Sequence, residues 1–170
     1  IGSSDIAVKF EVVEKPNDWT KEIKRNTSNS PTLQARYDYW MAFNEYAFKD
    51  IRFAKSFNKR KANTDHWMTF SIGSSACNVT LSQIRKFNHV IVECYIPDDK
   101  ELYHKFNFHK ADIETEMGVK LEWYELPEKK ASRILIWKTV DFENKDSWFE
   151  QFDWMMDMAI RMKKAFKKYI

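Results

Sequence analysis

Acidic and lysine residues are the first groups in this chain whose types and spacing suggest chemistry. Glu-x-Lys, with an acid on the neighbouring strand, can hold a divalent ion and let lysine activate water to cleave a phosphodiester. The strand-like run Glu93-Cys94-Tyr95 has tyrosine in the lysine position, whereas Glu128-Lys129-Lys130 and Glu143-Asn144-Lys145 fall in a turn and a loop. We therefore expect no catalytic residue in this chain.

Histidine and serine residues offer no better site. The four histidines are scattered, and His104 and His109 are five residues apart, a spacing that splays two side chains around a helix. The turn at Gly73-Ser74-Ser75 lacks the G-x-S-x-G pattern of a nucleophilic serine. We predict no metal site and no cofactor.

A basic segment with interleaved aromatic residues fits nucleic-acid binding better. The stretch from Lys49 to Lys61 holds six basic residues and one acid. Its last cations and the following tryptophan could bind a phosphate backbone and stack on a base; the residues are Lys59, Arg60, Lys61 and Trp67. A solvated helix end whose aromatics fill the core remains the alternative.

A second cationic turn contains Lys130, Ser132 and Arg133. Two cations and a hydroxyl can hold an anion through charge and hydrogen bonding. Alternatively, this is a solvated hairpin turn in which Arg133 pairs with Glu122 or Glu125 across the strands. The four lysines near the C-terminus, from 163 to 168, are interpreted as favourable charges at the end of a helix.

Hydrophobic alternation predicts the strands that carry these groups. One strand is expected near Ile6–Val12. A three-strand antiparallel meander and a two-strand hairpin should follow, at Met68–Ile72, Cys77–Ile84 and His89–Ile96, then Leu121–Leu126 and Arg133–Val140.

Helical periodicity and capping residues predict three helices. Ser30 caps the first, which runs to Phe48; Asp98 caps the second, which ends at Gly118; and a capping box of Ser147 and Glu150 starts the last, whose core face reaches the C-terminal isoleucine. The fold class is α+β, an antiparallel sheet packed by three helices.

Size and composition fit one such domain. With 170 residues and 44% hydrophobic residues, the chain can form a single core over residues 31–170, preceded by a strand and connection at 1–30. Cys77 and Cys94 lie in apolar runs and are expected to be buried, reduced thiols. No run approaches a membrane span and no signal peptide opens the chain, so we expect a cytoplasmic protein without a membrane partner.

The order of the sequence blocks resembles the bacterial DUF4268 family. The blocks are Tyr39-Trp40-Met41-Ala42-Phe43, His66-Trp67 with Ser71-Ile72-Gly73-Ser74-Ser75, Val90 to Ile96, Ile113 to Gly118, Leu121 to Ile134, and the helix from Trp148 to Phe166. The resemblance covers roughly residues 31–170. Ala76 departs from it, because the family often has glycine there.

This resemblance implies a functional context. Family members commonly carry an endonuclease-like domain of the carboxylate-and-lysine, metal-dependent type before this one, and residues 10–19 resemble the junction. The full-length protein would then be a metal-dependent endonuclease of which this chain is the C-terminal part.

Three hypotheses follow. The first is a non-catalytic accessory domain that binds DNA or RNA or positions the target, in defence against foreign DNA. The second is a protein-interaction domain that joins two nuclease-like domains as a homodimer, using the N-terminal strand and the Met- and Trp-rich last helix. The third is a small-ligand or enzyme pocket formed jointly by the turns at residues 73–75 and 130–133.

Overall fold

The computed structural model describes residues 30–170, so the expected strand and junction within residues 1–29 lie outside the described part. The described residues fall into two compact units. The smaller contains residues 30–41 and 62–65, and the larger contains residues 42–61 and 66–170.

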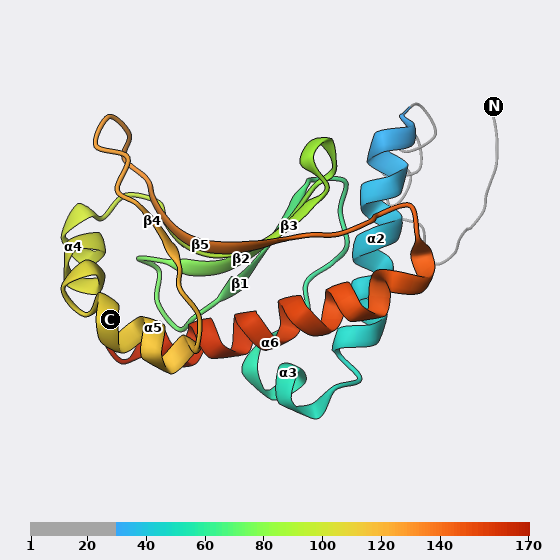
Figure 1. Cartoon of the computed structure of the whole chain (residues 1–170). Helices are drawn as coiled ribbons and strands as arrows, with labels where there is room; N and C mark the ends of the chain where they lie inside the picture. The colour runs from blue at the N-terminus through green and yellow to red at the C-terminus, as the bar shows by residue number, and fades with distance from the viewer. Residues whose placement is uncertain (1–29) are drawn as a thin grey trace. The chain divides into compact units, whose positions relative to one another are not determined.

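One five-stranded antiparallel sheet forms the centre of the larger unit (Figure 1). Its strands lie in the order β1-β2-β3-β5-β4, with the bounds Trp67–Ser71, Asn78–Ile84, His89–Ile96, Glu122–Tyr124 and Ser132–Thr139 for β1 to β5. The meander and the hairpin are both confirmed. They form one continuous sheet because β5 pairs with β3 over all eight residues from His89 to Ile96.

The described residues form five α-helices, so the expected number of three is corrected. They are α2 (Pro31–Ala47), α3 (Ile51–Ser56), α4 (Lys100–Phe108), α5 (Lys110–Met117) and α6 (Trp148–Lys167). The short α3 was not predicted, because its six residues make fewer than two turns and show no period. The second predicted helix is divided in two at His109.

Helix ends test the capping predictions individually. Ser30 does cap α2, since its hydroxyl accepts from the Leu33 N–H at 3.3 Å, and Gly118 ends α5 with a φ of 73°. Asp99, and not Asp98, caps α4 by accepting from the Leu102 N–H. The capping box at Ser147 is wrong, because its hydroxyl donates to the Asn144 carbonyl of the preceding turn.

The core lies between the sheet and α6, which runs along one face of the strands (Figure 1). From the sheet come side chains of alternate residues in β3, all fully buried: Val90, Val92, Cys94 and Ile96. From α6 come Phe152, Met155, Ala159, Met162 and Phe166. Burying each large apolar side chain contributes about 1.5–3 kcal/mol. The predicted core position Ile170 is exposed instead, since it lies beyond the end of α6.

Both cysteines are free and buried, as predicted. Within the smaller unit, the Trp40 indole donates to the Asp65 carbonyl at 2.9 Å and Arg36 donates to the Thr64 carbonyl, so side chains of α2 fix the loop at residues 62–65. No helix among residues 30–170 is both long and apolar enough to span a bilayer.

Candidate functional site

The sheet face that points away from α6, here called the outer face, carries exposed aromatic side chains. Alternation along the strands places on it the residues between the buried core positions. Trp67, Ser82, Ile91 and Trp137 are register partners on four successive strands. Both tryptophans are exposed, at 42% and 41%. Three strand spacings separate their backbones by about 14 Å.

A third exposed ring lies on the same face at the level of Arg133, which is four residues before Trp137 on β5. Tyr124 on β4 is the register partner of Arg133 on β5, which in turn faces Tyr95 on β3. Tyr124 is 44% exposed. The outer face therefore presents three separate aromatic rings, Trp67, Trp137 and Tyr124, from β1, β5 and β4.

Glu122 fixes two of these rings. Its Oε2 atom accepts a hydrogen bond of 2.7 Å from the Trp137 indole N–H. Its Oε1 atom accepts from the Tyr124 hydroxyl, which raises the pKa of Tyr124. One carboxylate thus holds both rings in place.

Trp137 is held from its other side by stacking. The ring of His89 lies 4.0 Å from the Trp137 ring, with an angle of 20° between their planes. Phe87, exposed in the turn between β2 and β3, lies 6.2 Å from His89. The aromatic surface therefore continues from Trp137 to the end of the sheet.

Arg133, a predicted anion-binding residue, has an acidic partner. Its Nε and Nη2 atoms donate to the two carboxylate oxygens of Glu93 at 2.6 and 2.9 Å. The Glu93 side chain is only 4% exposed, against 37% for Arg133. These hydrogen bonds raise the pKa of Arg133. The expected pairing with Glu122 or Glu125 is corrected, because Glu93 of β3 points to the same face.

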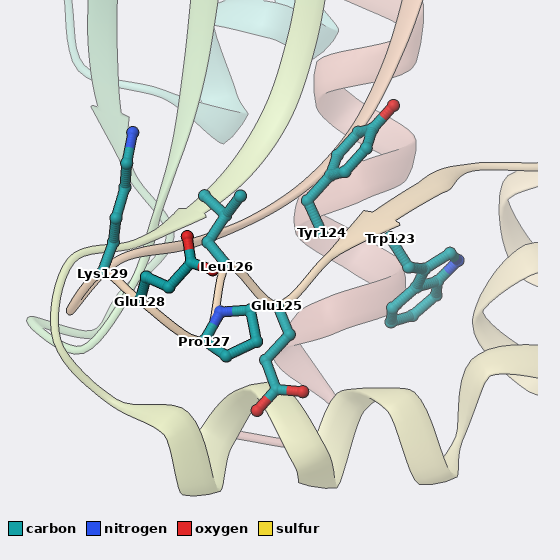
Figure 2. A pocket seen from close by; sticks show the side chains of 7 residues that line it. All are labelled: Trp123, Tyr124, Glu125, Leu126, Pro127, Glu128 and Lys129. Atoms are coloured by element: carbon teal, nitrogen blue, oxygen red, sulfur yellow. The ribbon is translucent and has the colours of Figure 1, made fainter.

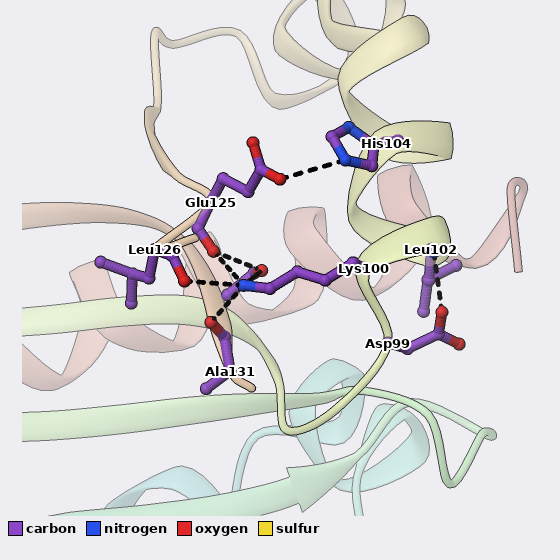
Figure 3. Close-up of polar contacts among 8 residues, drawn as sticks. Asp99, Lys100, Leu102, His104, Glu125, Leu126 and Ala131 are labelled. Atoms are coloured by element: carbon purple, nitrogen blue, oxygen red, sulfur yellow. Dashed lines mark hydrogen bonds and ion pairs between the residues drawn. The ribbon is translucent and has the colours of Figure 1, made fainter. Parts of the chain in front are cut away.

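Ser132, the predicted neighbour of this cation, is fully buried within the hairpin. Its hydroxyl donates to the Glu125 carbonyl at 2.8 Å and accepts from the Lys100 ammonium at 3.0 Å. Lys100 also donates to the carbonyls of Glu125, Leu126 and Ala131 (Figure 3). Four oxygens surround an ammonium group with three hydrogens, so Lys100 clamps the base of the hairpin.

The tip of this hairpin is hollowed. Residues 123–129 line a depression of about 320 Å³ (Figure 2), and a smaller one of about 170 Å³ lies near Asp141 and Ser147. Neither is lined by the turn at residues 73–75. By strand register the turns at 73–75 and 130–133 lie at the same end of the sheet but three strands apart, so these hollows do not join them.

The remaining predicted site residues are exposed. Lys59, Arg60 and Lys61 lie between α3 and β1, and the Arg60 carbonyl accepts from the Asn44 side chain at 2.7 Å. Lys130 lies at the hairpin tip, exposed like Lys129. Of the seven predicted residues, only Trp67 and Arg133 therefore have side chains on the outer face.

Sequence reasoning missed Trp137, Tyr124 and Glu122 as site residues. A usable signal was present in the hairpin: Trp123 and Tyr124 are adjacent in the first strand, and Trp137 directly follows the apolar run Ile134-Leu135-Ile136 in the second. Rings on both sides of a strand mean that one set cannot face the core.

Comparison with known proteins identifies a family and nothing more specific. The model of a family described as Domain of unknown function (DUF4268) matches residues 35–170. No curated protein and no solved structure gave a significant match. Among the described residues, no three histidine, cysteine or acidic side chains gather as they would around a metal ion.

Proposed function

We propose that this chain, which belongs to the DUF4268 family, binds single-stranded nucleic acid on the outer face of its sheet. The observation that carries the proposal is the set of three exposed rings on one face, two of them fixed by Glu122. Unpaired bases stack on such rings with little regard to sequence, contributing about 1–3 kcal/mol each.

The spacing of the rings favours unpaired over paired bases. Trp67 and Trp137 belong to strands about 14 Å apart, so one base cannot lie on both. Base pairs in a duplex expose only their edges in the grooves, whereas a single strand can present the face of each base in turn. Separate rings on one surface are therefore suited to successive unstacked bases.

Cations at both ends of the outer face complement a phosphate backbone. Lys86 is exposed in the turn that precedes His89, and Lys129 and Lys130 are exposed beyond Arg133. Each phosphate contact should release counterions and make binding weaken with salt. The basic stretch at Lys59–Lys61 precedes β1 and would extend the contact with the nucleic-acid backbone.

The second hypothesis, a protein-interaction domain that uses the N-terminal strand and the last helix, stays a prediction. The methionines of α6 at 155, 156, 158 and 162 are all buried, so this helix does not offer them to a partner. The expectation of an endonuclease-like neighbour, and of a role in defence against foreign DNA, stays a prediction.

Fluorescence anisotropy with labelled oligonucleotides tests the proposal. Single-stranded DNA and RNA of about 15 nucleotides and a duplex of the same sequence are titrated at several salt concentrations. We expect the single strands to bind more tightly than the duplex, and Trp137→Ala to weaken that binding by about 5- to 100-fold.

A matched control separates stacking from general hydrophobicity. Phe108 is 85% exposed at the end of α4, outside the sheet. Phe108→Ala should leave affinity unchanged. Equal affinity for duplex and single strand, or equal losses in the Phe108→Ala and Trp137→Ala proteins, would overturn the proposal.

A further inference from the structure

The end of α6 carries four lysines that fall into two pairs. Lys164 lies 3.8 Å from a carboxylate oxygen of Glu116, and Lys168 donates to the other oxygen of the same carboxylate. Among residues 30–170, no acidic side chain forms an ion pair with Lys163 or Lys167. Two cations therefore lie one helical turn apart without a negative charge between them.

The turn between β1 and β2 lies beside Lys167. Gly73 has a φ of +93°, and a Cβ atom built on it would lie 3.8 Å from the Lys167 ammonium. The end of the Lys167 side chain therefore lies beside Gly73, at a position whose backbone conformation suits glycine.

Hydrogen bonds within this turn leave two backbone donors unused. The Ser71 hydroxyl accepts from the Gly73 N–H and the Ser74 hydroxyl accepts from the Ala76 N–H, each at 3.0 Å. Within the described part of the chain, the N–H groups of Ser74 and Ser75 donate to no protein acceptor. Successive free N–H groups in a turn form a concave anion-binding surface.

Lys163 adds the second cation. Its ammonium donates to the Ser56 carbonyl and lies 5.2 Å from the centre of the Phe57 ring. Partial burial, and then repulsion by Lys167, lowers its pKa. Like charges four residues apart repel each other and destabilise a helix. An anion bound beside both lysines would relieve this repulsion.

We propose that a phosphate group binds between the β1–β2 turn and the lysines Lys163 and Lys167. A phosphate monoester carries about −1.5 to −2 charges and three acceptor oxygens, which match two ammonium groups and two backbone N–H donors. The site needs no contact with the outer face, so it stands independently of the proposed function.

Titration of the whole chain with inorganic phosphate, followed by amide NMR and by calorimetry, tests this site. The amide signals of Ser74 and Ser75 should shift together and saturate. Lys167→Ala should weaken phosphate binding at least tenfold, and Lys163→Ala should weaken it by several-fold. Lys164→Ala, on the same helix but paired with Glu116, should leave it within twofold.

Two sources of phosphate can be separated with oligonucleotides that carry or lack a 5′-phosphate. A terminal phosphate that tightens binding in the wild type but not in Lys167→Ala assigns the site to nucleic-acid ends. Equal binding of both oligonucleotides, with inorganic phosphate still bound, assigns it to small phosphates. Unshifted Ser74 and Ser75 amides, or equal losses in Lys164→Ala and Lys167→Ala, would overturn the site.

Discussion

Two turns at the same end of the sheet use lysine in opposite ways. In the β4–β5 hairpin, Lys100 donates to three carbonyls and to the Ser132 hydroxyl, so its hydrogen-bonding capacity is used within the fold. In the β1–β2 turn, Lys167 lies beside Gly73 with no acidic partner among the described residues. The first lysine holds structure together, whereas the second is free for a ligand.

By composition the β4–β5 hairpin is the better candidate for an anion site, whereas the contacts favour the β1–β2 turn. The β4–β5 hairpin contains the cations Lys129, Lys130 and Arg133, yet Arg133 pairs with the buried Glu93 of β3 and the buried Ser132 hydroxyl bonds to Lys100. The β1–β2 turn contains no cation, and its lysines arrive from α6 nearly a hundred residues later. The number of unsatisfied partners, and not the number of charges, distinguishes a ligand site from a structural one.

Among substitutions that remove a contact of the β4–β5 hairpin, Arg133→Ala should cause the largest loss of stability. The substitution leaves the buried Glu93 carboxylate without its bidentate partner, which should lower the free energy of unfolding by about 3 kcal/mol. Urea denaturation measures this loss. Lys130→Ala, at the exposed tip of the same hairpin, serves as the control, and equal effects of the two would contradict a structural role for Arg133.

Lys100→Ala should have the next largest effect. Removing the ammonium leaves a cluster of partly buried carbonyls without their donor, at a cost of about 2–3 kcal/mol in the free energy of unfolding. Lys105→Ala, exposed on the same helix, should change it by less than about 0.5 kcal/mol. A Lys100→Ala protein as stable as the wild type would show that the clamp contributes nothing.

Gly73→Ala, in the β1–β2 turn, should lower the free energy of unfolding by less than the two hairpin substitutions do. A residue with a Cβ is strained at a φ of +93°, so we expect a loss of about 1 kcal/mol in unfolding free energy. Ser75→Ala is the companion control, because its exposed side chain makes no hydrogen bond in the described structure. Thermal unfolding of the two variants side by side measures the difference.

The smallest predicted effects differ in sign. Lys167→Ala removes a repulsion with Lys163 and should stabilise the chain by about 0.2–0.5 kcal/mol at low salt. Lys164→Ala removes an attraction to Glu116 and should destabilise the chain slightly. Both differences should shrink in high salt. The same sign for both variants would contradict the assignment of unpaired and paired lysines.

Hydrophobic alternation was sufficient to place the five described strands. Its predicted boundaries for β3 match at both ends, and those of β1 and β2 differ by one residue. Glycine at 118 and serine at 30 were found because each acts through local backbone chemistry. The division at His109 and the loss of the Ser147 cap depend on hydrogen bonds to neighbouring turns, which periodicity does not contain.

The candidate site was predicted only in part. The sequence predicts Trp67 as a site residue because it adjoins a basic segment, whereas it predicts Trp137 only as part of a strand. Its place level with Trp67 on the same face depends on the register of β3 with β5, which sequence spacing leaves open. Ser132 shows the reverse case, since its burial beside Lys100 could not be foreseen from a turn rich in polar residues.

Ultraviolet crosslinking shows where on the chain a single strand of nucleic acid binds, and so tests binding across the outer face. A photoreactive single-stranded oligonucleotide is crosslinked to the wild-type chain, and mass spectrometry identifies the modified peptides. We expect crosslinks concentrated in the peptides that contain Trp67, Tyr124 and Trp137. Crosslinks concentrated at Phe108 or Phe149, which are exposed on α4 and α6, would contradict it.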